Sequence, residues 1–260
     1  MRIATYNING IKARLERLTD WLARARPDVV CLQELKSEDA GVPRGPIEDL
    51  GYRVETHGQK GFNGVAILSR LPMSEVVRGL PGDEADEQAR WIEATIEEGA
   101  RVVRLVCLYA PNGNPAPGPK YDYKLGWMAR MEARAAAMLA DEVPVVLAGD
   151  YNVIPSDIDA AHPAAWAADA LALAPSRAAL RRILHLGYGD ALRLRHPGPG
   201  IYTFWDYQAG AFARNDGIRI DHLMLSPQAA DLLVDAGVDA AERAAERPSD
   251  HVPVWIDLGP

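Results

Sequence analysis

Apolar residues along the chain follow two patterns: short continuous runs and runs with helical spacing. The short runs are rich in β-branched residues, which is typical of buried or half-buried strands. The clearest of them cover residues 52–57, 64–68, 91–96 and 102–109. The chain is therefore expected to contain many short strands, more than a simple doubly wound sheet has.

Two segments have helical spacing and stop before a proline. The first repeats apolar side chains at Leu15, Leu18, Trp21, Leu22 and Ala25 and stops at Pro27. The second is expected over residues 124–140 and stops before Pro144. Each is followed by an apolar strand with an acidic tip, which predicts an α/β (α+β) fold in layers.

Five strand-like segments carry an acid or amide near one end. They cover residues 3–7, 29–34, 145–152, 218–222 and 248–254. Their polar residues are Asn7, Glu34, Asp150, Asn152, Asp221 and Asp250. Capping or a turn is the simpler interpretation of any one of them. As a set they favour two sheets whose acidic tips converge at one edge.

Convergence of these side chains would require a counter-charge. Two carboxylates about 4 Å apart repel by about 4 kcal/mol at an effective dielectric near 20. Carboxylate and amide oxygens suit Mg²⁺, or Mn²⁺ in its place, and the chain has no cysteine and histidine spacing of the zinc type. The pattern therefore predicts a metal site at which Asp150 and Asn152 hold an attacking water.

His251 directly follows Asp250, the last acid of these five segments. Successive side chains of an extended segment point to opposite sides, so Asp250 is expected to face a metal and His251 a phosphate. A carboxylate partner, for which Asp221 is the candidate, would fix the imidazole tautomer and raise the pKa of His251.

Composition narrows the class of protein. The 260 residues carry a net charge of −8 with a pI of about 5.3, which argues against coating of nucleic acid by bulk positive charge. Cys31 and Cys107 lie in apolar runs, so free buried thiols and a reducing cytoplasm are expected. No signal segment or membrane-length apolar stretch is evident. We expect one domain over residues 1–260, soluble and not exported.

One further helix could begin at Ser176 and carry three arginines on one face. These are Arg177, Arg181 and Arg182, and apolar side chains occupy the other face. A solvated helix surface and a phosphate contact are both compatible with this pattern.

Six motifs resemble, in order, those of the exonuclease III group of the endonuclease/exonuclease/phosphatase superfamily. They are TYNING (5–10), CLQELK (31–36), YAPNG (109–113), GDYN (149–152), RID (219–221) and SDH (249–251). The resemblance covers essentially the whole chain. It implies a four-layer sandwich, in which helices flank two facing mixed sheets, with the active site at one edge.

The resemblance also implies an activity and a set of roles. The expected activity is cleavage of duplex DNA 5′ to abasic sites, 3′ to 5′ exonuclease activity and removal of 3′ phosphates. The metal ligands would be Asn7, Glu34 and Asp250. A second metal position would use Asp150, Asn152 and His251. Asp150 would activate water with Asn152 as its partner, Tyr109 and His251 would contact phosphate, and Asp221 would orient the histidine. The number of metals stays open, as does the choice between Asp150 and the Asp221–His251 pair as general base.

Candidate DNA contacts surround these motifs. Phe204, Trp205, Ile218 and Ile220 could form a pocket for a flipped base-free sugar, with core packing as the alternative. Asn112 lies in a Pro- and Gly-rich surface loop over residues 112–119. The candidate basic contacts are Lys36, Lys60, Lys120, Lys124, Arg214 and Arg219.

Two other functions fit part of the pattern. One is a phosphoesterase acting on RNA, phospholipids or inositol phosphates with the same metal, and the other is a catalytically silent nucleic-acid-binding module. The loop with Asn112 and the Phe204–Trp205 strand favour DNA. The chain is expected to act as a monomer in a bacterial cytoplasm.

Overall fold

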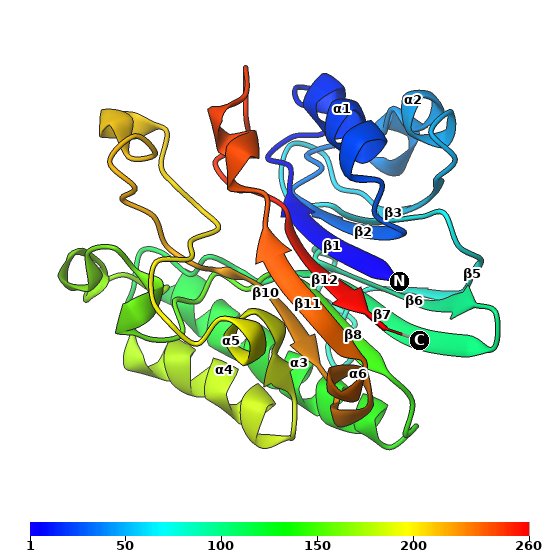
Figure 1. Cartoon of the computed structure of the whole chain (residues 1–260). Coiled ribbons are helices and arrows are strands. Elements are labelled where there is room, and N and C mark those ends of the chain that lie inside the picture. Colours follow the sequence, from blue (N-terminus) through cyan, green and yellow to red (C-terminus); the bar gives the residue numbers. More distant parts are fainter. Residues whose placement is uncertain (260) are drawn as a thin grey trace.

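Two six-stranded sheets face each other in the computed structural model, which describes residues 1–259 (Figure 1). The first sheet has the order β11-β12-β1-β2-β4-β3. Its strands are β1 (Arg2–Asn7), β2 (Val29–Gln33), β3 (Arg53–His57), β4 (Val65–Ser69), β11 (Leu233–Val238) and β12 (Val254–Leu258). The second has the order β5-β6-β7-β8-β10-β9. Its strands are β5 (Met73–Arg78), β6 (Trp91–Glu98), β7 (Arg101–Tyr109), β8 (Val145–Asp150), β9 (Gly189–Asp190) and β10 (Asp221–Leu225).

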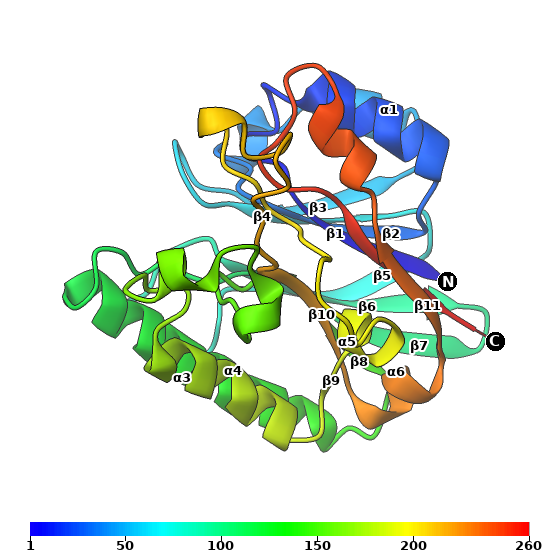
Figure 2. The ribbon, with the colours of Figure 1, turned by 60° about the vertical axis from the view of Figure 1, so that its left-hand side comes forward.

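Helices cover the outer face of each sheet and complete four layers (Figure 2). The first sheet carries α1 (Leu15–Ala25) and α2 (Arg44–Glu48), and the second carries α3 (Pro119–Leu139) and α4 (Ala174–His185). The short helices are α5 (Ala191–Arg195), α6 (Pro227–Asp231), and the 3₁₀ turns η1 (Asp39–Gly41), η2 (Asp157–Asp159), η3 (Pro163–Trp166), η4 (Gln208–Gly210) and η5 (Ala240–Ala244). The predicted sandwich is confirmed. None of the described helices combines the length and apolar character needed to cross a membrane.

The continuous apolar runs reflect strands that are buried on both faces. In β2, Val29 and Cys31 point into the core between the sheets, while Val30 and Leu32 pack with Trp21 of α1. On the other side of the molecule, Trp127 of α3 packs against the outer face of the second sheet. Cys31 and Cys107 are buried free thiols, as predicted.

The helix starts differ from the sequence prediction. Helix α3 begins at Pro119 rather than at residue 124, because proline fits the first helical turn, where its missing N–H has no partner to lose. Helix α4 begins at Ala174, so Ser176 is not its cap. The Ser176 hydroxyl instead donates to the Ala170 carbonyl at 2.6 Å.

The arginines of α4 are largely occupied in surface ion pairs. Arg177 pairs with Asp157 and also donates to the Ile154 carbonyl, and Arg182 pairs with Glu132. These contacts favour the interpretation of this face as a helix surface.

Asp221 begins a strand instead of ending one. β10 runs antiparallel to β8, and its register pairs Asp221 with Asp150. Asp250 likewise precedes β12, which runs antiparallel to β1. The start of an antiparallel strand lies at the same sheet edge as the end of its neighbour, so the predicted convergence holds although the predicted strand direction at Asp221 was wrong.

A buried ion network lies beside the start of β10. Arg219 is 1% exposed and donates to Asp159 at 2.7 Å and to Asp190 at 2.6 Å. Arg193 donates to the same Asp159 carboxylate. Burial opposes ionisation of Asp159, but the two guanidinium groups hold its pKa at about 2. The network fixes the segment that leads into β10.

Asp159→Asn is expected to lower the free energy of unfolding by about 3 kcal/mol, because it removes one partner of a buried charge. The ionised acid stabilises the fold above its ordinary pKa of 3.8, and this contribution is lost as the pH falls toward about 2. The difference between the variant and the wild type should therefore shrink over that range. Urea unfolding followed by circular dichroism measures both effects.

The matched control is Asp157→Asn, which alters a neighbouring acid whose side chain is 73% exposed. Its effect should stay within about 1 kcal/mol, as for surface ion pairs. Equal losses in the two variants would contradict the assigned role of the buried network.

Candidate active site

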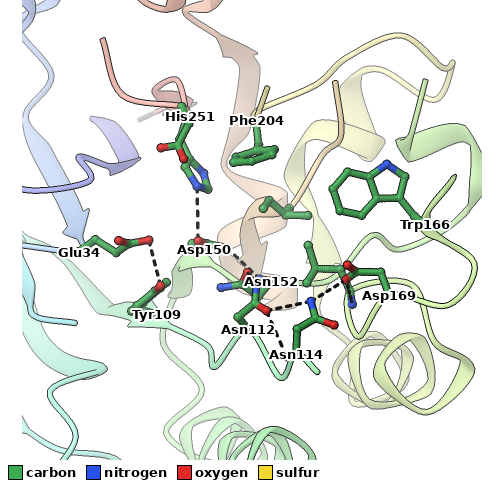
Figure 3. Close-up of a pocket in the computed structure, with 13 residues that line it drawn as sticks. Glu34, Tyr109, Asn112, Asn114, Asp150, Asn152, Trp166, Asp169, Phe204 and His251 are labelled. Carbon is green, nitrogen blue, oxygen red and sulfur yellow. Dashed lines mark hydrogen bonds and ion pairs between the residues drawn. The ribbon is translucent and has the colours of Figure 1, made fainter. Parts of the chain in front are cut away.

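Residues from both sheets line one cleft of about 250 Å³ at the converging edge (Figure 3). Glu34 follows β2 of the first sheet, while Tyr109 and Asp150 end β7 and β8 of the second. The complete lining is Glu34, Tyr109, Asn112, Asn114, Asp150, Asn152, Trp166, Asp169, Leu171, Phe204, Ile220, Asp250 and His251. A polar end and an apolar end therefore share one opening.

Two of the polar residues have a left-handed backbone. Glu34 has φ of 55° and Asn152 has φ of 49°. This region costs free energy for residues other than glycine, and such strain concentrates at functional sites. The turns at these residues place both side chains in the lining of the cleft, shortly after a buried strand.

Among residues 1–259, Glu34, Asp150 and His251 form one group of three acidic or imidazole side chains that could hold a metal ion. One ligand atom from each lies within 4.8 Å of the others. The Asn7 amide donates to Glu34 at 3.0 Å and to Asp150 at 2.9 Å, and it therefore joins the two acids across the two sheets. The Tyr109 hydroxyl donates to Glu34 at 2.9 Å.

The two acids differ in electrostatic environment. Burial opposes ionisation of Glu34, but hydrogen bonds from Asn7 and Lys36 hold its pKa below its usual range. Burial and repulsion from Asp221 raise the pKa of Asp150 to about 7, although the Asn152 backbone N–H donates to it at 2.8 Å. Asp150 can therefore gain or lose a proton near neutrality.

His251 lies between two acids. Its Nδ1 is 2.9 Å from Asp221, as the sequence predicted, and its Nε2 is 3.8 Å from Asp150. Burial alone would lower the pKa of His251, but Asp221 and, more weakly, Asp150 and Asp250 raise it to about 10. The Phe204 ring contacts the imidazole edge-on at a centroid distance of 5.0 Å. The imidazole is therefore a fixed cation at the cleft.

The donor set fits a hard divalent cation. Glu34 and Asp150 offer carboxylate oxygens, Asn7 contributes an amide, and the acids repel one another in a buried setting that a cation would relieve. Asp250 lines the same cleft and accepts from Asn9 at 2.9 Å. Glu34 and Asp250 thus line one cleft, whereas Asn7 is fully buried and reaches Glu34 through its hydrogen bond.

The predicted DNA contacts divide into exposed and buried residues. Lys36, Asn112 and Arg214 are exposed, and Phe204 lines the cleft. Lys36 pairs with Glu34 at 2.9 Å, and Arg214 pairs with Asp216. These four side chains can be reached by a ligand.

Four other residues that were predicted to contact DNA are buried, so the prediction of direct contact is wrong for them. Trp205 packs with Tyr202, and Ile218 belongs to the apolar cluster beneath the cleft. Arg219 is held by the ion network beside β10, and Lys124 is fully buried. For Trp205 and Ile218 the alternative of core packing was correct, whereas Ile220 does line the cleft.

Several residues of the cleft lining were not predicted. These are Asn114, Trp166, Asp169 and Leu171. Trp166 ends the turn η3, and Asp169 accepts from the Asn114 side chain at 3.0 Å. An isolated tryptophan in an alanine-rich loop was the only available signal, and no local pattern connected it to strands far away in the sequence.

Similarity to known proteins spans the chain. Residues 4–251 match the Endonuclease/Exonuclease/phosphatase family. The chain is 33% identical to exodeoxyribonuclease III of Haemophilus influenzae, with 99% of this chain and 100% of the relative covered. An AP endonuclease structure from Archaeoglobus fulgidus superposes with a TM-score of 0.93 at 37% identity, with 99% of each chain covered. The structure of the 3′ phosphatase NExo from Neisseria, bound to a product DNA hairpin, gives a TM-score of 0.94 at 36% identity and the same coverage.

Asp221→Asn is expected to return the pKa of His251 from about 10 toward or below its ordinary value of 6.5, because burial then outweighs the remaining acids. Titration of the imidazole ¹⁵N shifts in metal-free protein measures the change. Asp20→Asn on α1 is the control and should leave the His251 titration unchanged. A His251 that stays protonated well above neutrality in Asp221→Asn would show that Asp221 is not its main partner.

Proposed function

The chain belongs to the endonuclease/exonuclease/phosphatase family, and from that premise we propose that it is a DNA repair nuclease that hydrolyses phosphodiester bonds. Its substrates would be duplex DNA with abasic sites, 3′ ends degraded in the 3′ to 5′ direction, and 3′ phosphates. The observation that carries the proposal is that Glu34, Asp150 and His251 lie together in one cleft, with His251 hydrogen-bonded to Asp221.

Asp150 and His251 have complementary roles in this proposal. Asp150, with its pKa raised to about 7, accepts the proton of the attacking water, and Asn152 positions that water. His251 is held cationic by Asp221 and binds a phosphate oxygen. The Tyr109 hydroxyl donates to Glu34 in this structure and would serve as a second phosphate donor only after turning its hydrogen away from that acid. The Asp221–His251 pair is the alternative general base.

We assign the metal position to Asn7, Glu34 and Asp250, with Mg²⁺ as the expected ion and Mn²⁺ as a substitute. A second position would use Asp150, Asn152 and His251, and a metal there would require the imidazole to give up its proton. A bound divalent cation supplies charge neutralisation and polarises the scissile phosphate. The hydrogen bond that the Asn7 amide donates to Glu34 holds both side chains in place for it.

The apolar end of the cleft suits a sugar without a base. Phe204, Ile220, Leu171 and Trp166 form its walls. Extrusion of an abasic nucleotide sacrifices little stacking, and an apolar wall accepts the bare deoxyribose ring. Exposed Lys36, Lys60, Lys120, Arg214 and the loop with Asn112 would contact the flanking duplex, and a single copy of the chain would bind it.

The wild type is expected to cut a duplex that carries one abasic analogue when Mg²⁺ is present, and not in EDTA. Asp150→Asn should lower the rate about 10²- to 10⁴-fold, the range of a lost general base. Asp157→Asn makes the same chemical change outside the cleft and should retain the activity. Cleavage in EDTA would contradict the metal dependence, and full activity of Asp150→Asn would contradict the role of Asp150 as general base. A recessed 3′ end and a 3′-phosphate end, assayed in parallel, rank the three activities.

Binding to duplex DNA is expected to weaken steeply with salt despite the net charge of −8, because local cations displace condensed counterions. Lys120→Met should reduce the slope of log affinity against log salt by about 1. Arg53 lies at the start of β3, at the end of the sheet away from the cleft, so Arg53→Met should leave the slope unchanged. Fluorescence anisotropy in EDTA gives these slopes, and a flat response of the wild type would contradict the electrostatic footprint.

A further inference from the structure

Lys124, in the second turn of α3, is a fully buried lysine outside the proposed chemistry. Its ammonium donates to the carbonyls of Asn112 at 3.0 Å, Asn152 at 2.5 Å and Ala170 at 3.4 Å. These acceptors belong to three separate loops, which follow β7, β8 and η3. All three loops contribute residues to the wall of the cleft.

The bonding pattern suits a charged lysine. An ammonium has three N–H donors, which match the three carbonyl acceptors. The direct partners of the ammonium are therefore the three carbonyl dipoles. Burial lowers the pKa of Lys124 to about 7, and the negative charges of Asp150 and Asp169 oppose that shift.

The surrounding backbone is shaped around this side chain. Gly113 has φ of +91°, and a Cβ at that position would lie 2.7 Å from the Lys124 Cδ and 3.2 Å from the Ala170 Cβ. Glycine therefore lets the loop pass directly over the lysine stem. The Ala170 carbonyl also accepts a hydrogen bond from the Ser176 hydroxyl. The same hydroxyl contacts the Tyr121 hydroxyl of α3.

The three loops connect directly to the proposed catalytic groups. Asn112 donates to the Asn152 side chain at 3.2 Å, and the Asn152 amide donates to the Ala110 carbonyl at 2.9 Å. The Asn152 backbone N–H donates to Asp150. In Figure 3, Asn112, Asn114 and Asp169 continue this chain of contacts along the floor of the cleft.

We propose that Lys124 is a positioning residue that joins the three loops and holds Asn152 and Asp150 in their reactive arrangement. The inference rests on the proposed nuclease function. It assigns Lys124 a part in the chemical step and none in contact with DNA. A neutral side chain of similar length would leave three carbonyls without their donor and release the loops from one another.

Lys124→Met is expected to lower kcat about 10- to 100-fold, the scale of small misplacements of catalytic groups, with little change in KM. Amide hydrogen exchange should become faster over residues 110–118 and 151–173, while the strands β6 and β7 keep their protection. Single-turnover cleavage of the abasic duplex and exchange detected by mass spectrometry give the two readouts.

Arg130→Met is the matched control on the same helix. Arg130 donates to Asp86 and to the Leu80 carbonyl, away from the cleft, so its loss should lower the melting temperature and leave kcat intact. The proposal would be overturned by an unchanged kcat in Lys124→Met or by exchange that becomes faster across the whole chain in that variant. It would also be overturned if Arg130→Met lost kcat in proportion to its loss of stability. A wild type that cleaves no DNA would refute the nuclease function, whereas loop protection would still decide whether Lys124 joins the loops.

Discussion

The pairing of Asp221 with Asp150 across β10 and β8 places two buried carboxyl groups side by side, and the other polar groups of the cleft compensate this repulsion. The His251 imidazole lies between them, with one nitrogen toward each acid. Thr203 donates to Asp221 at 2.6 Å, and Asn7 donates to Asp150 from the opposite sheet. The site therefore depends on the position of the two sheets relative to each other.

Rigidity around this cluster comes from buried charges that take no part in the proposed chemistry. Arg219 and its two aspartates fix the chain that enters β10, and Lys124 joins the loops that leave β7 and β8. Buried ions are a poor source of net stability, because desolvation offsets their attraction. Their value here is directional, since each fixes the position of a backbone segment that carries a cleft residue.

Local sequence patterns could predict the acids at the sheet edge but not the arrangement of the cations. Asn7 and Asp150 were predictable because each ends an apolar strand, and Glu34 because it directly follows one, since strand ends fall at sheet edges. Asp221 was placed at the correct edge with the wrong strand direction. The burial of Arg219 and Lys124 was missed, since Asp159 and the carbonyls of Asn152 and Ala170 meet them only through tertiary packing. Trp166 was missed for the same reason, since only tertiary packing places it in the cleft lining.

The distribution of protons explains how two adjacent groups can perform different tasks. Near neutrality the His251 imidazole retains its proton, because its pKa is raised to about 10, whereas Asp150, with a pKa of about 7, exchanges one readily. A bound divalent cation favours the ionised form of a nearby carboxylate, and this lowers the pKa of Asp150. Such a cation would also oppose the positive charge of His251, which the Asp221 carboxylate would have to sustain. This asymmetry favours Asp150 as the proton acceptor and His251 as the phosphate ligand.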